Sequence, residues 1–362
     1  MSRLAPKPGI MDIDPYVGGL HTVEGFEEVV VLASNEGPLG ASPLAIKAYE
    51  REARRLHLYP DGSAEELRAA IGQRFGLNPA QIVCGAGSDE IISLLISAYA
   101  GGGDEVLYSA HGFLMYPINA KSAGATPVAA PEKNLTASVD ELLSAVTERT
   151  KMLFLANPNN PTGSYIPVDE LRRLREGLPD HVLMVIDAAY AEYVSRNDYT
   201  SGAGLVEEYN NIVMTRTFSK AFGLAAVRLG WAYCSTEVAD VLNRVRNPFN
   251  VTAPAQATGI AAVGDLSHTD AAIAHNDEWL PKFTAELKNL GYEVAPSVGN
   301  FVLVRFDSSK VARSAYDYLL SRGVITRMMG GYGLPESLRL TIGLGSELEK
   351  VIDDLSAYRK SL

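Results

Sequence analysis

A lysine, an arginine and several hydroxyl groups lie close together in residues 215–230, directly after a short apolar run. Lys220 follows what we expect to be a buried strand, where a charged amine is costly unless it is paired, neutral or covalently used. Arg228 lies among small residues, an environment that suits a guanidinium bound to phosphate. With Thr217 and Ser219, these groups indicate a site for pyridoxal phosphate (PLP), whose aldehyde needs an amine and whose phosphate needs donors. A surface lysine with an unrelated arginine is the simpler interpretation of this segment alone.

Two further polar segments follow apolar runs. Asp187 ends the run 182–186, and a carboxylate at the mouth of a buried strand needs a cationic partner, such as a protonated pyridine nitrogen. Tyr190 follows closely and can donate to the phenolate oxygen of the same ring. Residues 157–163 read Asn-Pro-Asn-Asn-Pro-Thr-Gly, and the two X-Pro units direct Asn160 back over the strand end, where its amide can donate too. The simpler alternatives are a helix-capping aspartate and a polar turn.

Four other residues have types and positions that suit a ligand. Ser88 and Asp89 open a helix after a glycine-containing turn, so they would present free N–H groups to a phosphate, although ordinary helix capping is an equal alternative. Phe113 follows a strand and can stack on a pyridine ring, or can simply be helix core. Arg339 lies between two leucines of a strand, so alternation directs its guanidinium to the opposite face, toward a substrate carboxylate or toward solvent.

Alternating strands and helices from residue 81 to about 234 predict an α/β fold with a mostly parallel central sheet covered by helices. The predicted elements include a helix at 113–123 and, in a smaller α/β unit near the C-terminus, a strand at 324–327. We expect three segments: an N-terminal arm with part of the small domain at 1–45, a large PLP-binding domain at 46–265, and a C-terminal small domain at 266–362.

Composition narrows the possible partners. The chain has 362 residues and a net charge of −11, which argues against nucleic acid or an anionic membrane as the main partner. Cys84 and Cys234 both lie in apolar strand-like runs, so we interpret them as reduced core residues and expect no metal site. Because no apolar run reaches membrane-spanning length, we expect a cytoplasmic protein.

With these motifs in this order, the sequence resembles the fold-type I PLP-dependent enzymes, and among them the histidinol-phosphate aminotransferases. The resemblance extends from Tyr16 to the final helix and is strongest at 157–163, 187–190 and 219–228. It implies that Lys220 binds PLP as an imine and then moves the proton between the substrate Cα and the cofactor. Burial and the charge of Arg228 are expected to lower the pKa of this lysine. Phe113 falls where the family usually has a tyrosine, and only the stacking role survives that change.

The resemblance assigns the other contacts residue by residue. Asp187 would pair with the pyridine nitrogen, and Asn160 and Tyr190 with the phenolate oxygen; the family often has Glu where this chain has Ala188, a change from which we expect little consequence. Tyr59 would reach the cofactor phosphate of a partner subunit, which implies a homodimer with shared active sites. The phosphate would otherwise be held by Ser88, Asp89, Thr217, Ser219 and Arg228. The substrate would be bound by Tyr16, Asn35, Arg327 and Arg339, with Arg339 on its carboxylate and with Tyr16 and Arg327 near the histidinol phosphate group.

The implied activity is a reversible ping-pong transamination between L-histidinol phosphate and 2-oxoglutarate, a step of histidine biosynthesis. An aromatic amino-acid aminotransferase shares every cofactor residue and stays open as an alternative. A threonine-phosphate decarboxylase, which resembles the family and keeps the cofactor, is a second. A PLP-binding transcriptional regulator is disfavoured, because no basic helix-turn-helix module precedes the sheet and the chain is acidic.

Overall fold

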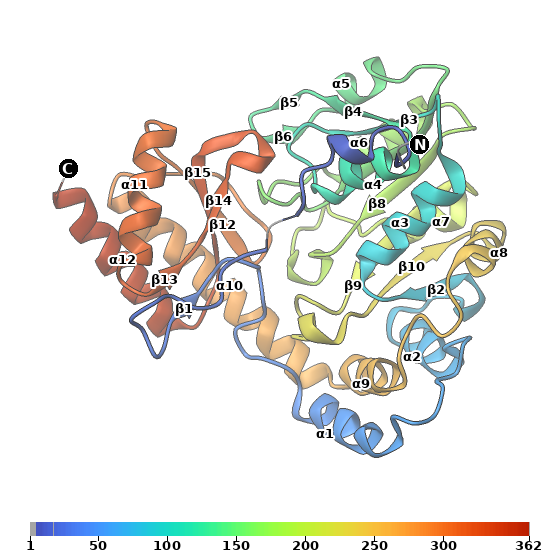
Figure 1. Ribbon diagram of the computed structural model, residues 1–362, viewed down its shortest axis with the longest axis horizontal. Coiled ribbons are helices and arrows are strands. Elements are labelled where there is room, and N and C mark those ends of the chain that lie inside the picture. Colours follow the sequence, from blue (N-terminus) through green and yellow to red (C-terminus); the bar gives the residue numbers. More distant parts are fainter. Residues whose placement is uncertain (1–4, 17, 362) are drawn as a thin grey trace.

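A computed structural model describes residues 5–16 and 18–361, which form two lobes side by side (Figure 1). The large lobe contains a seven-stranded sheet, in the order β2-β10-β9-β8-β7-β3-β4, and the small lobe a four-stranded sheet, in the order β11-β12-β15-β14. The seven strands are β2 (Ile82–Gly85), β3 (Glu105–Ser109), β4 (Thr126–Ala130), β7 (Thr150–Ala156), β8 (Leu183–Asp187), β9 (Ile212–Thr217) and β10 (Gly230–Cys234). The four are β11 (Glu293–Val294), β12 (Phe301–Arg305), β14 (Arg327–Met329) and β15 (Leu334–Thr341).

Helices cover both faces of the large sheet and one face of the small one. Those of the large lobe are α1 (Pro43–Glu52), α2 (Glu65–Phe75), α3 (Ser88–Tyr99), α4 (Met115–Ala123), α5 (Val139–Ser144), α6 (Val168–Gly177), α7 (Ala203–Glu208), α8 (Thr236–Val245) and α9 (Ala253–Gly264). Those of the small lobe are α11 (Ser309–Leu320) and α12 (Gly345–Lys360), and the long helix α10 (Leu266–Asn289) runs from one lobe to the other (Figure 1). The predicted boundary at residue 265 lies at the start of α10, and the division into domains stays a prediction.

Alternation along the strands explains why both faces of the large sheet are buried. On β7, Leu153 and Leu155 join a core cluster with side chains of α2, α5, α6, α7 and α9. Met152 and Phe154, which point the other way, join a second cluster with α3, α4 and α8. A strand that is buried on both faces needs an apolar residue at nearly every position, which is the pattern of β8 and of residues 152–156 of β7. In β9 only residues 212–214 are apolar, and the strand becomes polar toward its carboxyl end.

The direction of the strands fixes where a site can form. Neighbours among β4, β3, β7, β8 and β9 pair in parallel, whereas β10 is antiparallel to both β9 and β2. The parallel strands therefore end at one edge of the sheet, where the loops after β3, β7, β8 and β9 lie. Ligands of such sheets bind at this edge.

The N-terminal segment connects the two lobes. Lys121 of α4 donates to the carbonyl of Asp12 at 2.9 Å, which fastens residues 5–16 to the large lobe. Further on, β1 (Val30–Val31) pairs in parallel with β13 (Val324–Ile325) in the small lobe. The chain then returns past the sheet edge before it enters α1 (Figure 1).

Two predicted elements were partly wrong. The helix predicted at 113–123 begins at Met115, because the Gly112 N–H donates to the Ser109 carbonyl and closes a turn that carries Phe113 past the strand end. The strand predicted at 324–327 is two strands: 324–325 pair with β1, and 327–329 pair with β15. The change of partner interrupts the strand at Thr326, and hydrophobicity alone does not show it.

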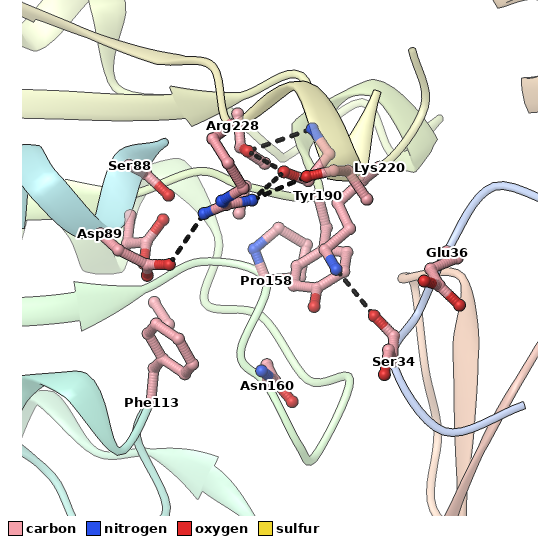
Figure 2. A pocket seen from close by; sticks show the side chains of 16 residues that line it. Ser34, Glu36, Ser88, Asp89, Phe113, Pro158, Asn160, Tyr190, Lys220 and Arg228 are labelled. Atoms are coloured by element: carbon pink, nitrogen blue, oxygen red, sulfur yellow. Dashed lines mark hydrogen bonds and ion pairs between the residues drawn. The ribbon is translucent and has the colours of Figure 1, made fainter. Parts of the chain in front are cut away.

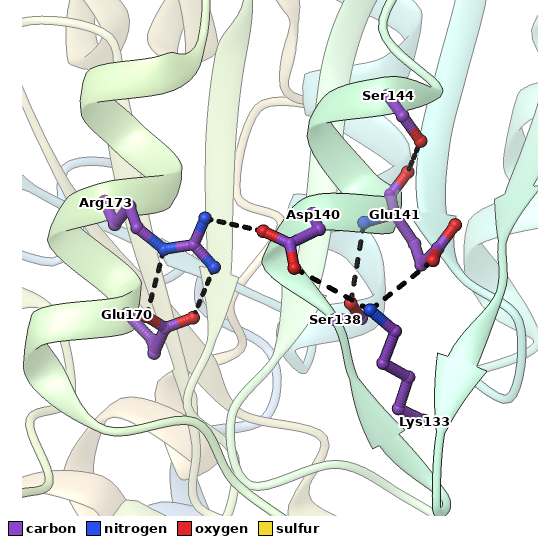
Figure 3. A network of polar contacts seen from close by, with 7 residues as sticks. All are labelled: Lys133, Ser138, Asp140, Glu141, Ser144, Glu170 and Arg173. Atoms are coloured by element: carbon purple, nitrogen blue, oxygen red, sulfur yellow. Dashed lines mark hydrogen bonds and ion pairs between the residues drawn. The ribbon is translucent and has the colours of Figure 1, made fainter.

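An ion-pair network lies on the surface of the large lobe (Figure 3). Lys133, in the hairpin of β5 (Glu132–Lys133) and β6 (Thr136–Ala137), lies 3.7 Å from Asp140 and 3.6 Å from Glu141 of α5. Arg173 of α6 binds Asp140 at 2.8 Å and Glu170 at 2.7 Å. Because these side chains are largely exposed, water and salt screen the pairs, and the network contributes little to stability.

Gly223 offers a test of how tightly the loop after β9 is packed. Its φ is +66°, and a Cβ there would lie 2.0 Å from the carbonyl oxygen of Gly40. Gly223→Ala should therefore lower the free energy of unfolding by about 2–4 kcal/mol, measured by urea titration. Gly204→Ala is the matched control, because a Cβ at this position of α7 meets no atom within 4 Å. Equal losses in the two variants would contradict the packing argument.

Candidate active site

The largest concentration of predicted site residues lies in one pocket at the carboxyl edge of the large sheet (Figure 2). Loops after β7, β8 and β9, the start of α3 and the segment around Ser34 form its walls. Ten of the fifteen predicted residues line it: Ser88, Asp89, Phe113, Asn160, Asp187, Tyr190, Thr217, Ser219, Lys220 and Arg228. The structure thus brings together residues that are up to 140 positions apart in the chain, from 88 to 228.

Lys220 follows β9 and points into this pocket. Its Nζ donates to the Ser34 carbonyl at 2.9 Å and lies 5.8 Å from the centre of the Tyr190 ring (Figure 2). Burial lowers the pKa of Lys220 to about 8, and the charge of Arg339 is the second cause. The effect of Arg228, the cation expected from the sequence, is smaller. More of the amine is neutral near pH 7 than in an ordinary lysine, as a nucleophile or general base requires.

Asp187 ends β8 and is only 5% exposed. Its Oδ2 accepts a hydrogen bond from Tyr116 Oη at 2.8 Å, and its Oδ1 accepts one from Thr215 Oγ1 at 3.2 Å. Burial raises the pKa of Asp187 to about 6, while the two hydrogen bonds act in the opposite direction. A cationic N–H in the pocket would stabilise the charged carboxylate further.

The start of α3 and the loop after β9 form a cradle of hydrogen-bond donors. Gly87 precedes α3 with φ +86°, and a Cβ there would lie 2.5 Å from Arg228 Nη2, so only glycine permits this close approach. Arg228 Nη1 donates to Ser219 Oγ at 3.4 Å, and Thr217 Oγ1 donates to the same oxygen at 3.0 Å. Arg228 Nη2 also binds Asp89 Oδ2 at 3.2 Å (Figure 2). Free helix N–H groups, hydroxyls and a guanidinium suit a phosphate.

Arg339 and Asn35 lie directly behind the pocket wall. Arg339 is 6% exposed, and its guanidinium donates to Asn160 Oδ1 and, at 2.7 Å, to the Ala33 carbonyl. Asn35 Nδ2 donates to Tyr190 Oη at 2.9 Å. Burial raises the pKa of Tyr190 to about 12, so its phenol keeps its proton and can donate. A guanidinium held in this way at the edge of the pocket suits a carboxylate.

Tyr16 and Arg327 line a neighbouring pocket between the N-terminal segment, α4 and the small lobe. The Arg327 guanidinium lies 5.8 Å from the centre of the Tyr16 ring. The two pockets are adjacent, because Leu114 lines this one and Phe113 lines the first. In addition, Arg327 pairs in register with Arg339 across β14 and β15. A ligand that reaches both pockets would therefore lie near both Arg327 and Arg339.

Tyr59 lies apart from these residues. Its side chain is 83% exposed in the turn between α1 and α2 and stacks on Phe249, with ring centres 4.7 Å apart. It lines neither of the two pockets within one chain. Its contact with a partner subunit stays a prediction.

Sequence reasoning missed several contacts of the pocket. Tyr116 and Thr215 both bind Asp187, and Ser34 binds Lys220 through its carbonyl. Tyr116 follows Phe113 by three residues, but Phe113 lies before the start of α4, so helical spacing did not indicate their contact. A contact through a backbone carbonyl, such as that of Ser34, leaves no signal in the sequence.

Three structural findings bear on metal sites, membrane spans and disulfides. Within residues 5–16 and 18–361, no group of His, Cys, Asp and Glu side chains is arranged to hold a metal ion. The helices of that same part of the chain are all too short or too polar to cross a membrane. Cys84 and Cys234 are buried and are not joined in a disulfide.

Similarity to known proteins identifies the family. Residues 27–355 match the family described as aminotransferase class I and II. The chain belongs to this family. It is 59% identical to the histidinol-phosphate aminotransferase of Paramagnetospirillum magneticum, over 99% of both chains. It is 56% identical to that of Rhodospirillum centenum, over 99% of this chain and 100% of the relative.

Solved structures of aminotransferases share the fold. The histidinol-phosphate aminotransferase of Sinorhizobium meliloti, in complex with pyridoxal-5'-phosphate, matches with a TM-score of 0.91 and 26% identity, over 100% of this chain and 98% of that one. Thermus thermophilus aspartate aminotransferase with maleate matches in fold, with a TM-score of 0.81 and 22% identity over 91% of both chains. The predicted fold, a fold-type I α/β transferase with a large and a small lobe, is confirmed.

The lowered pKa of Lys220 can be measured without any ligand. In the cofactor-free aminotransferase, modification of Lys220 by an amine reagent should be half-maximal near pH 8, because the pKa is lowered to about 8. The measurement is the modification rate against pH, read by mass spectrometry of the Lys220 peptide. In the urea-unfolded chain the same peptide should follow the ordinary lysine value of 10.5. Identical midpoints in the folded and unfolded chains would show that the site does not perturb the amine.

Proposed function

We propose that this aminotransferase uses PLP to transfer the amino group reversibly between L-glutamate and imidazole acetol phosphate, which gives 2-oxoglutarate and L-histidinol phosphate, a step of histidine biosynthesis. The observation that carries the proposal is one pocket that is lined by Lys220, with its lowered pKa, by Asp187 and by the donor cradle around Arg228. The 59% identity to a histidinol-phosphate aminotransferase over 99% of the chain supports the choice of reaction.

The residues of the pocket fit PLP group by group. The donor cradle at Arg228 and Ser219 would hold the phosphate, and the close contact of Arg228 with Gly87 keeps that cradle compact. Asp187 would accept the N–H of the pyridine ring from the end of β8. Asn160 and Tyr190 would meet the phenolate oxygen, and Phe113 the face of the ring. These roles are predictions that the pocket geometry supports.

The chemistry assigns two tasks to the chain. When bound, PLP withdraws electrons from the substrate Cα, so that the α-hydrogen can leave as a proton. Lys220 would bind the cofactor's aldehyde and later hold and return that proton, which its lowered pKa favours. Asp187 would keep the pyridine nitrogen protonated. Its hydrogen bonds from Tyr116 and Thr215 favour the charged carboxylate that this requires.

The two pockets together suit both substrates. Arg339 would bind the α-carboxylate of glutamate, a group that histidinol phosphate lacks. Arg327 and Tyr16, in the adjacent pocket, would bind the phosphate of histidinol phosphate. Asn35 would contribute through Tyr190 at the boundary between the substrate and the cofactor. One enzyme would thus accept two substrates with different anionic groups.

A homodimer with shared active sites is part of the proposal. Apolar side chains of α1 and the turn after it are exposed, namely Leu44 at 51%, Tyr49 at 48%, Leu56 at 70% and Leu58 at 50%. Tyr59 and Phe249 extend this surface. An apolar surface of this kind is typical of a protein interface. A cytoplasmic location stays a prediction.

Replacing Arg327 tests the choice of substrate. Arg327→Ala should lower kcat/KM for histidinol phosphate roughly 100-fold, since hydrogen bonds to charged groups contribute about 3 kcal/mol, and should change phenylalanine turnover far less. The measurement is steady-state transamination with 2-oxoglutarate, and Arg313→Ala, an exposed arginine of α11, is the control. Equal losses on both substrates would favour the aromatic alternative, and release of CO2 from threonine phosphate would favour the decarboxylase.

Mixed dimers test the sharing of sites. Chains with Lys220→Ala are combined with chains that carry Tyr59→Phe, and activity is measured at limiting PLP. If Tyr59 acts across the interface, one of the two sites in the hybrid contains both intact side chains, and the hybrid is more active than either parent. Hybrids that match the average of the parents would place Tyr59 outside the partner's site.

A further inference from the structure

Tyr116 of α4 connects two of the predicted cofactor contacts, although it does not line the pocket itself. The side chain is fully buried, and its hydroxyl donates to Asp187 Oδ2 at 2.8 Å. Its ring lies at nearly a right angle to that of Phe113, with centres 5.9 Å apart and planes at 88°. One side chain therefore contacts both the carboxylate expected at the pyridine nitrogen and the aromatic ring expected on the pyridine face.

The packing around Tyr116 leaves its hydroxyl little freedom. The ring stacks on Phe154 of β7, with centres 4.8 Å apart and planes at 21°, and meets Tyr108 of β3 edge-on at 6.4 Å. Aromatic neighbours on three sides hold the ring in one orientation, so the phenol points at the end of β8. Thr215 binds the other carboxylate oxygen at 3.2 Å, and the two donors fix the plane of the Asp187 carboxylate.

We propose that Tyr116 is a positioning residue of the transamination site: its hydroxyl holds the Asp187 carboxylate in the orientation and the ionised state that the pyridine nitrogen of PLP requires. The inference rests on the PLP-dependent function proposed above. It assigns Tyr116 a role that a tyrosine kept only for packing would not have, because phenylalanine would fill the same space.

The electrostatics of the site show why such a donor is needed. Burial raises the pKa of Asp187 to about 6, and the negative charge of Asp89 on α3 acts in the same direction. Hydrogen bonds from Tyr116, from Thr215 and from the backbone N–H of Ala189 oppose this rise. The other titratable groups that line the same pocket are Glu36, Tyr190, Lys220 and Arg228. Of the three donors, Tyr116 has the largest effect, so its removal should leave more of the carboxyl protonated near neutral pH.

The experiment compares Tyr116→Phe with Tyr108→Phe. Both variants remove one phenol oxygen from the same aromatic cluster, but only Tyr116 donates to Asp187. The carboxyl of Asp187 is titrated by infrared spectroscopy in the cofactor-free protein, with its band assigned by Asp187→Asn. The dissociation constant of PLP is measured from pH 5.5 to 8.5, a range chosen around the pKa of about 6.

In Tyr116→Phe the titration midpoint of Asp187 should rise by about one pH unit, a tenfold change in the ratio of its two protonation states. PLP affinity should then weaken nearly tenfold at pH 5.5 but hardly at pH 8.5, and should begin to fall at a higher pH than in the unaltered protein, because the protonated carboxyl no longer attracts the pyridine N–H. In an Asp187→Asn background, Tyr116→Phe should cause no further loss. Tyr108→Phe should leave the midpoint unchanged.

A fluorinated tyrosine at position 116 provides a second variant that keeps the size and the packing of the ring. Its more acidic phenol is a stronger donor, so the midpoint of Asp187 should move down rather than up. The proposal would be overturned if the titration midpoint of Asp187 stayed unchanged with phenylalanine or with the fluorinated tyrosine at position 116. Equal effects of Tyr116→Phe and Tyr108→Phe on that midpoint would overturn it too. Failure of the unaltered protein to bind PLP would instead refute the proposed function, whereas the infrared titration would still decide the role of Tyr116.

Discussion

The Asp187 carboxylate, 5% exposed at the end of β8, is the group on which the rest of the site depends. A buried carboxylate is unfavourable unless donors or a cation compensate for the lost water. Tyr116 and Thr215 supply two donors, and together with the backbone they only partly offset the burial, since the pKa still rises to about 6. Asp187 lines the pocket, so a cationic ligand bound there would complete the compensation for the buried charge.

The topology of the large sheet places the other polar groups of the pocket near Asp187. Parallel strands end at one edge, so the loops after β7, β8 and β9 place Asn160, Tyr190 and Lys220 around Asp187. The small lobe contributes from the opposite side: Arg339 of β15 reaches across to Asn160. The Ser34 carbonyl, from the segment that joins the lobes, accepts from Lys220. Because these contacts cross between the lobes, a change in the angle between the lobes would alter both the position of the Arg339 guanidinium and that of the Lys220 amine.

The parts of this arrangement that follow from local sequence were predictable, and those that depend on tertiary contacts were not. Apolar runs identified the strands, and the polar residue at the end of each run identified Asp187 and Lys220, because strand ends meet at one edge. The strand is interrupted at Thr326 because it changes its pairing partner there, and α4 begins only at Met115 because a turn precedes it. The hydrophobicity of the sequence indicates neither feature. Tyr116 lies in an otherwise ordinary helix, and the hydrogen bond of its hydroxyl to Asp187 at the end of β8 is a tertiary contact that the local sequence does not indicate.

The distribution of charge explains how an acidic protein can bind anionic ligands. The chain carries a net charge of −11, yet Arg228, Arg327 and Arg339 lie in or beside the two adjacent pockets. These cations can attract a cofactor phosphate, a substrate phosphate and a carboxylate, and local donors of this kind outweigh a distant, screened net charge. Arg339 also lowers the pKa of Lys220, second only to burial. The same guanidinium that suits a substrate carboxylate therefore helps to keep the amine neutral. Binding of a carboxylate would cancel part of that charge and raise the basicity of Lys220, which is the direction that favours acceptance of the α-proton once the amino acid is in place.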